Sequence, residues 1–163
     1  MSDITDELTL SSCFVEGLKK FDNFKGRASK REYTGFSLYA MFLSIWIGVN
    51  FISIMYMILP DLLEIHGISV VFYVFLIVAP IYVPTIAVTV RRLHDVGKSG
   101  VHAIVPMVCF VAQILVLHPR LFNIGLFLVL FLVNVIISIP LNVVLARKGD
   151  VGVNGYGTDP LER

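Results

Sequence analysis

Four long stretches of this chain contain no charged residue, and they constrain its fold more than any other feature. Residues 36–59 form an uncharged run of 24 residues, and residues 68–90 and 124–146 form runs of 23. Because an α-helix rises 1.5 Å per residue, about 20 apolar residues cross the roughly 30 Å hydrocarbon core of a bilayer. Residues 100–117, as a helix of about 27 Å, are just long enough to cross. The pattern predicts an all-α membrane protein, a bundle of four transmembrane helices.

The composition agrees with this prediction and excludes some functions. Hydrophobic residues make up 56% of the 163 residues and charged residues 15%, against about 25% charged in a soluble domain. The net charge of +1 leaves no basic excess for nucleic acid, so no nucleic-acid partner is expected. No Asp, Glu, Lys or Arg lies within the four runs, although coupled pumps usually keep ionisable groups at that depth.

The basic residues lie on one side of the predicted bundle. Of the 13 Lys and Arg residues, all except Arg120 precede the first run, follow the second, or follow the fourth. The positive-inside rule makes that side the cytosol. With three spans the basic residues of the tail would lie on the opposite side, so their placement supports four. We therefore expect residues 1–35 as a cytosolic segment, 36–146 as the transmembrane domain, and 147–163 as a cytosolic Gly-rich tail.

Residues 4–21 are predicted to form an amphipathic helix. Six apolar residues share one face of it, namely Ile4, Leu8, Phe14, Val15, Leu18 and Phe21. Such a helix can lie on the cytosolic surface of the membrane, with lysines near lipid phosphates. It can equally pack against its own bundle. The two interpretations stay open at this point.

The segment from Phe24 to Tyr33 precedes the first predicted span. Ser29, followed three residues later by Glu32, is a capping box that begins the first spanning helix. Gly26 permits a turn before it. The basic residues of the segment, including Arg27 and Arg31, would then lie at the level of the headgroups, where the two flanking aromatic residues can anchor.

The second cytosolic segment runs from Arg91 to Gly100. Arg91 and Arg92 end the second helix, and Gly97 with Gly100 makes a tight reversal into the third. The adjacent His94 and Asp95 suggest an acid–base pair or metal ligands. No second ligand motif accompanies them. A structural hydrogen-bonding role is favoured, and no metal or cofactor is expected.

The tail is predicted to be a turn-rich loop, because four glycines and an Asn-Gly pair fall within nine residues. A loop docked on the cytosolic face is favoured over disorder. The expected structural residues here are Gly152, Asn154, Tyr156, Gly157, Asp159 and Pro160.

The four runs contain few polar side chains. Asn50, Gln113, Asn134 and Asn142 are the amides among them, and such groups most often join helices through hydrogen bonds. Prolines in the second, third and fourth runs predict kinks.

Three separated segments together resemble the signature of the domain of unknown function 805 family. They read Phe24-Lys-Gly-Arg-Ala-Ser-Lys-Arg-Glu-Tyr33, then Arg91-Arg-Leu-His-Asp-Val-Gly-Lys-Ser-Gly100, then Gly152-Val-Asn-Gly-Tyr-Gly-Thr-Asp-Pro160. The family usually has Trp where this chain has Thr34, and again after the Ser-Gly pair, where it has Val101 and His102. Since these are small, uncharacterised bacterial inner-membrane proteins, the resemblance implies a multi-pass inner-membrane location and no reaction.

All three segments fall on the cytosolic side of the predicted bundle. The leading hypothesis is a non-enzymatic bundle whose cytosolic rim binds anionic lipid headgroups or a protein partner. In it, four arginines pack against Glu32, Asp95 and Asp159, and the binding candidates are Arg27, Arg31, Arg91, Arg92 and Lys98. The alternatives are a small oligomeric transporter or channel and, third, a membrane enzyme that uses His94 and Asp95.

Overall fold

The computed structural model describes residues 10–58, 67–116 and 123–161. In chain order its elements are α1 (Leu10–Lys19), α2 (Lys30–Ile58), α4 (Gly67–Asp95), the 3-10 helix η1 (Gly100–Ala103), α5 (Ile104–Val116) and α6 (Ile124–Ala146). The described ranges contain no strand, only an isolated bridge between Asn154 and Gly157. The all-α prediction is confirmed.

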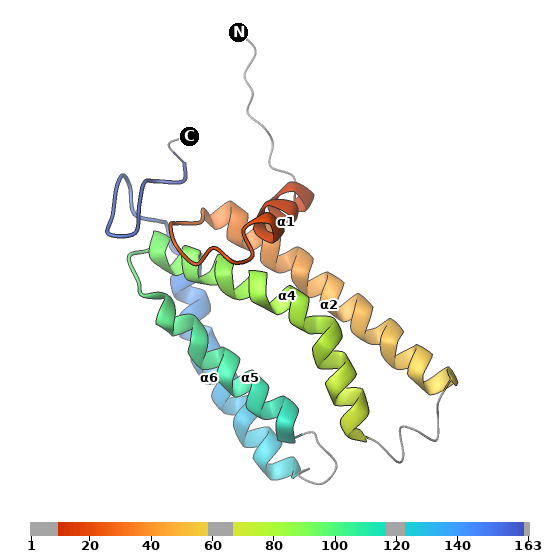
Figure 1. The fold of residues 1–163 in the computed structure, drawn as a ribbon. Coiled ribbons are helices and arrows are strands. Elements are labelled where there is room, and N and C mark those ends of the chain that lie inside the picture. The colour runs from red at the N-terminus through yellow and green to blue at the C-terminus, as the bar shows by residue number, and fades with distance from the viewer. Residues whose placement is uncertain (1–9, 59–66, 117–122, 162–163) are drawn as a thin grey trace.

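The helices form two packed pairs. α2 packs against α4, and α5 packs against α6; η1 contacts α4 and so joins the pairs at one end (Figure 1). That end also carries α1 and the tail that follows α6. The charged segments of the sequence are therefore gathered at one end of the fold.

Two helices in the described part of the chain are long and apolar enough to cross a membrane. They are Lys30–Phe51 within α2 and Gly125–Ala146 within α6. Gly100–Gln113 is a shorter apolar helix, and α4 has 29 residues, which is about 43 Å of helix. The number of crossings and their direction stay predictions.

α1 ends at Lys19, two residues before the predicted end of the amphipathic helix, and it packs on α2. It begins at Leu10, and residues 1–9 lie outside the described residues. The Phe14 ring stacks on Phe36 with centroids 5.2 Å apart, and its centroid lies 4.5 Å from that of Tyr39. The packed interpretation therefore holds for this face of α1, which also buries Cys13.

The remaining apolar residues of the predicted face are exposed where the structure describes them. Val15 is 48% exposed, Leu18 38% and Phe21 51%. Ile4 and Leu8 lie outside the described residues. One face of α1 thus belongs to the protein core, and another apolar face points away from it.

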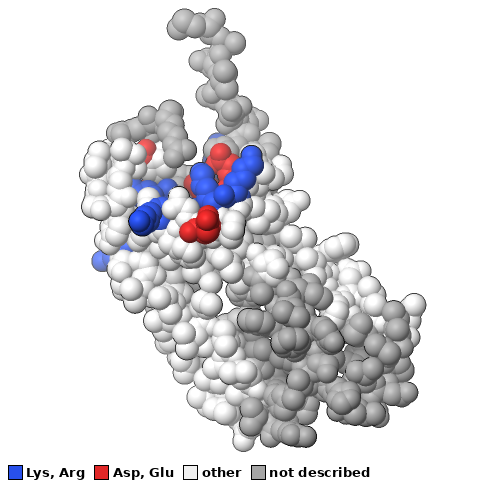
Figure 2. All heavy atoms as spheres, viewed as in Figure 1, with Lys and Arg blue, Asp and Glu red and all other residues white. Residues whose placement is uncertain are grey.

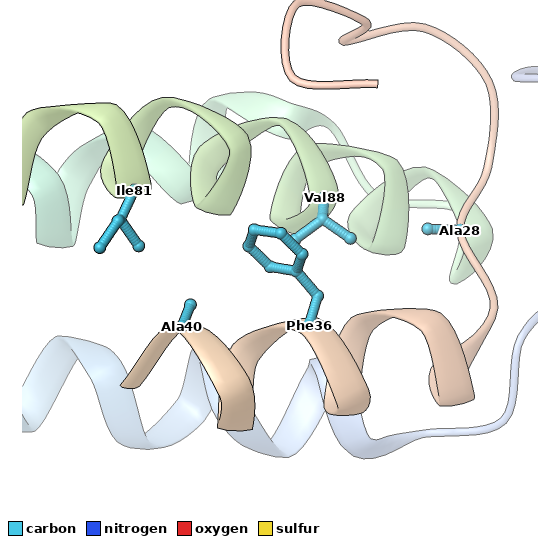
Figure 3. Packing of buried hydrophobic residues seen from close by; sticks show 5 residues of the cluster. All are labelled: Ala28, Phe36, Ala40, Ile81 and Val88. Atoms are coloured by element: carbon cyan, nitrogen blue, oxygen red, sulfur yellow. The ribbon is translucent and has the colours of Figure 1, made fainter. Parts of the chain in front are cut away.

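The main core cluster lies between α2 and α4 near the charged end. Phe36 and Ala40 on α2 face Ile81 and Val88 on α4, and Ala28, from the segment before α2, closes the cluster (Figure 3). This packing fixes the start of α2 against the last turns of α4. The arginine-bearing segments on both elements are thereby brought together.

A second cluster joins the two helix pairs. Val90 and Leu93 from α4 pack with Ala103 of η1 and Leu145 of α6. Tyr33 lies partly buried between this cluster and the first, which places its ring inside the protein rather than at an exposed aromatic anchor.

Much of the apolar surface away from these clusters is exposed. On α6, Ile136 is 67% exposed and Ile139 60%, and on α2 Trp46 is 66% exposed. Large contiguous apolar patches are rare on soluble monomers, whereas lipid covers such faces in a membrane bundle.

Candidate functional site

Asp95 lies at the centre of a buried cluster of charges. Its Oδ1 accepts from Nε of Arg27 at 2.9 Å, and Nη2 of Arg27 lies at the same distance. Its Oδ2 accepts from Nη1 of Arg92. All three side chains are at least 96% buried. We call Arg27, Glu32, Arg91, Arg92 and Asp95 the arginine cluster.

Arg27 connects the segment before α2 to the tail. Its Nη1 donates to the carbonyl of Gly152 and, at 3.4 Å, to that of Gly157, while its Nη2 donates to the carbonyl of Asp150. The backbone N–H of Asp150 in turn donates to the carbonyl of Asp95 at 2.8 Å. The tail is therefore docked on the arginine cluster through its backbone.

Arg92 holds the end of α6 in the same way. Its Nε donates to the carbonyl of Leu145 at 3.0 Å, and its Nη2 donates to that of Arg147. Carbonyls in the last turn of a helix lack partners within the helix. Arg92 satisfies two carbonyls at this helix end while its charge is balanced by Asp95.

Arg91 joins the connection between α1 and α2 to α4. Its Nη1 donates to the carbonyls of Lys20 at 2.9 Å and Asn23 at 2.6 Å, and its Nη2 pairs with Glu32 at 3.2 Å. Its Nε is buried without a partner among the described residues. The carbonyl of Arg91 also accepts from the N–H of Ala28 at 3.0 Å.

One of the two hydrogen bonds of the predicted capping box is present. Ser29 Oγ accepts from the N–H of Glu32 at 3.1 Å, which begins α2 at Lys30. The Glu32 carboxylate pairs with Arg91, although a full box would turn it back to the N–H of Ser29. The cation offers this carboxylate a stronger partner than a neutral amide does.

His94 faces the tail rather than Asp95. Its Nδ1 lies 3.1 Å from the carbonyl of Gly26, and its ring stacks on that of Tyr156 with centroids 4.0 Å apart. Its carbonyl accepts from Asn154 Nδ2 at 2.9 Å. These contacts are hydrogen-bonding and stacking contacts, as a structural role requires. The Asp95 carboxylate pairs instead with Arg27 and Arg92.

The glycines of the three segments make the close turns possible. Gly26 has φ of +78° and Gly97 of +68°, in the left-handed region that favours glycine. Gly100 lies so close to α4 that a Cβ there would fall 2.6 Å from Cγ1 of Val90. The predicted reversal from α4 into η1 is therefore tight on both sides.

Several predicted site residues lie outside the arginine cluster. Asp159 was expected to pair with an arginine, but its carboxylate accepts from the N–H groups of Gly152 at 3.4 Å and Leu161 at 2.9 Å. Arg31, Lys98 and Phe24 are exposed, and Pro160 follows in the last described turn. Asp159 thus bonds within the tail and not to an arginine as predicted, and Arg31 is exposed rather than packed among the buried charges.

The charged side chains of the arginine cluster are paired with one another and buried. Burial lowers the pKa of the Arg92 guanidinium, and the carboxylate of Asp95 opposes that shift, so Arg92 stays charged near neutral pH. No group of three or more His, Cys, Asp or Glu side chains among the described residues could hold a metal ion.

A cavity of about 290 Å³ opens beside the arginine cluster, between the start of α2 and the tail. Its charged lining is evenly divided between Lys30, Arg92, Lys148 and Asp95, Asp150, Asp159. The balance gives an anion no net attraction. Gly149 and Asp150 were predicted as part of the turn-rich tail, but not as neighbours of Asp95.

These features define a small helical protein with an apolar body and one charged, salt-bridged end. The chain belongs to the family described as Protein of unknown function (DUF805), whose model matches residues 21–158. This confirms the resemblance. The matched range holds the whole arginine cluster.

The chain is also similar to named proteins of Escherichia coli. It is 25% identical over 147 residues to Inner membrane protein YhaI of strain K12, covering 90% of this chain and 93% of that protein. The protein of the same name in strain O157:H7 gives the same values. No solved structure matches the chain significantly.

Proposed function

We propose that this protein spans a bacterial inner membrane four times, with both ends in the cytosol. The spans are α2, α4, η1 with α5, and α6. Three observations support this: the apolar length of the helices, the placement of every Lys and Arg except Arg120 on one side, and the printed name of the relatives. The arginine cluster then lies at the cytosolic end.

We further propose a non-enzymatic role in which the cytosolic face binds anionic lipid headgroups. The observation that carries it is the division of the basic residues into two sets. Arg27, Arg91 and Arg92 are buried and bonded within the protein. The exposed set among the described residues consists of Lys19, Lys25, Lys30, Arg31, Lys98, Arg147 and Lys148, while Lys20 is half-buried and pairs with Glu16 at 3.5 Å. The exposed set is free to attract lipid phosphates.

Figure 2 shows described Lys and Arg side chains gathered, with Asp and Glu, at one end of the visible face. Exposed apolar side chains lie on the same segment of chain as the first lysines. Val15, Leu18, Phe21 and Phe24 are each 38 to 51% exposed. Apolar residues beside lysines are the composition of a helix that lies in a membrane interface.

The position of α1 supports the same proposal. Because Phe14 contacts Tyr39, three residues into the predicted first span, α1 lies beside the point where α2 would enter the bilayer. Tyr39 is itself 43% exposed. The exposed face of α1 therefore continues the apolar surface of α2 at headgroup depth, where anionic phosphates and acyl chains are both within reach.

The test compares lipid retention in two neutralised variants. Lys19→Gln, Lys25→Gln and Arg31→Gln are combined, and Arg120→Gln, on the opposite side of the proposed membrane, is the control. Native mass spectrometry counts phosphatidylglycerol and phosphatidylethanolamine carried by the purified protein. Each lost charge should weaken phosphatidylglycerol binding about fivefold, since a basic residue near an anionic surface contributes about 1 kcal/mol.

Phosphatidylethanolamine retention should stay the same in all three proteins. Equal phosphatidylglycerol retention in the triple variant and in the wild type would contradict the lipid proposal. A cytosolic protein that co-purifies with the wild type and is lost from the triple variant would favour a protein partner instead.

A further inference from the structure

A cavity of about 240 Å³ lies between the two helix pairs, and none of its lining residues is charged. Half of its 14 lining residues carry polar groups. Six of these form two stripes at helical spacing: Tyr82, Thr85 and Thr89 on α4, and Asn134, Ser138 and Asn142 on α6. Residues three or four apart share one helix face, so each stripe faces the space between the pairs.

The stripes occupy one half of the proposed membrane. The predicted spans 68–90 and 124–146 have their middles near residues 79 and 135, so Tyr82 and Asn134 lie near mid-depth. Thr89 and Asn142 lie toward the cytosolic end. The cavity ends at Leu145, whose carbonyl accepts from Arg92. The polar lining thus extends from the arginine cluster to the middle of the bilayer.

Three of these side chains use a donor within their own helix and keep acceptor atoms. Thr85 Oγ1 donates to the carbonyl of Ile81 at 2.6 Å, and Thr89 Oγ1 donates to that of Thr85 at 2.7 Å. Asn142 Nδ2 donates to the carbonyl of Ser138 at 2.9 Å. A hydroxyl that has given its proton to its own helix keeps two lone pairs. Such acceptors are costly in a dry apolar environment.

Part of the polar lining does join helices, as the sequence suggested. Asn134 Nδ2 donates to the carbonyl of Pro106 at 3.2 Å, and Ser138 Oγ donates to Asn134 Oδ1 at 3.0 Å. The first bond joins α6 to α5, and the second lies within α6 and orients the Asn134 amide. On the α4 stripe, the Tyr82 ring stacks on Phe110 of α5 with centroids 5.0 Å apart, whereas α4 and α6 come together near the charged end (Figure 1).

We infer that this cavity is a water-accessible binding site for small uncharged hydrogen-bond donors such as amides and alcohols, reached from the cytosolic half of the membrane. The inference rests on the four-span arrangement proposed above. The volume corresponds to about eight water molecules at roughly 30 Å³ each, so only a small solute fits. An ion would lose its hydration with no opposite charge in the lining, at a large free-energy cost.

The test measures alkylation of cysteines placed on two faces of α6 in lipid nanodiscs. Cys13→Ala and Cys109→Ala remove the native thiols. Ser138→Cys then faces the cavity, and the adjacent Ile139→Cys, at a position 60% exposed, faces lipid at the same depth. Thiolates form only where water reaches. Iodoacetamide should therefore react with the thiol of Ser138→Cys at least about tenfold faster than with that of Ile139→Cys.

Iodoacetate tests the class of ligand, because it matches iodoacetamide in size and differs in charge. The ratio of the iodoacetamide rate to the iodoacetate rate should be at least about tenfold larger for Ser138→Cys than for Ser99→Cys at the exposed turn. Equal ratios would overturn the preference for uncharged molecules. Thr85→Cys, with Val83→Cys as its exposed control, repeats the test from α4 in case Ser138→Cys does not fold.

The outcomes separate this inference from the topology. Slow reaction at both 138 and 139 would mean that the cavity is filled by lipid or a neighbouring protein, and the inference would fail while the four spans stand. Reaction at both positions as fast as at Ser99→Cys would place α6 in water, and the four-span proposal itself would fail.

Discussion

Gly149 occupies a position where no side chain fits. A Cβ there would overlap the carboxylate of Asp95. This carboxylate pairs with Arg27 and Arg92, and moving it away would break both ion pairs. Gly155, in the same tail, has nothing within 4 Å of such a Cβ. Neither residue has a positive φ. The two glycines therefore differ in what surrounds them and not in backbone strain.

The pair supports a prediction at the residue scale. Gly149→Ala should lower the free energy of unfolding by about 1–3 kcal/mol, which is typical of overpacking a close-packed site. Gly155→Ala should change it by less than about 0.5 kcal/mol, as exposed substitutions do. Thermal unfolding of both variants in the same detergent measures the difference. Equal melting temperatures would mean that the tail does not rest on Asp95.

At the scale of elements, α1 shows how packing controls a titratable group. Burial raises the pKa of the Cys13 thiol above its ordinary 9.0, with Arg31 opposing the shift. Because the folded state favours the protonated thiol, docking of α1 is fully supported below pH 9 and weakens as the pH rises through the raised pKa. The thiol should also react slowly while α1 stays docked.

Alkylation of Cys13 in a Cys109→Ala protein tests this docking. Phe14→Ala removes the ring that stacks on Phe36, and it should raise the rate of reaction with iodoacetamide at pH 8 by at least about tenfold, since losing a packed Phe costs about 3–5 kcal/mol. Val15→Ala, on the exposed side of α1, should leave the rate within about twofold. A rate that is equally fast in all three proteins would show that α1 is not docked.

The elements themselves were largely predictable, because long apolar runs have few folded solutions other than helices. Ser29 as the residue before α2 was predictable from its spacing to Glu32. The hydrogen-bond partners of the arginines were only partly predictable from the sequence. Asp95 was expected among them, but most of the acceptors for Arg27 and Arg92 are backbone carbonyls, which every residue has and no sequence pattern marks.

The polar cavity shows a second limit of the sequence. The sequence marks Asn134 and Asn142 as amides within a span, for which a helix-joining role is favoured, but it does not single out Ser138 between them. Whether such a stripe meets another helix or faces a space depends on how the helix pairs diverge. That divergence depends on contacts between elements, such as those of η1 with α4, which no spacing within one stripe encodes.

At the scale of the whole molecule, the arginine cluster couples segments that are remote in the chain. Arg27 precedes α2, Asp95 ends α4, and residues 147–161 follow α6. The Asp95 carboxylate nevertheless pairs with Arg27, and both residues bond to the backbone of Asp150 in the tail. A buried cluster of this kind tends to form or fail as a unit, because each member left unpaired becomes an uncompensated buried charge. The charged end should therefore open cooperatively.

Hydrogen exchange can test this cooperativity through two amides far apart in sequence. The N–H of Ala28 donates to Arg91, and that of Asp150 donates to Asp95. Asp95→Asn leaves two buried arginines without their carboxylate and should destabilise the charged end by about 3–5 kcal/mol. Protection of both amides should fall together by a similar factor, while Asp22→Asn, at an exposed position, changes neither. If only the Asp150 amide lost protection, the tail and the segment before α2 would be attached independently, and the cluster would be a set of separate bonds rather than one lock.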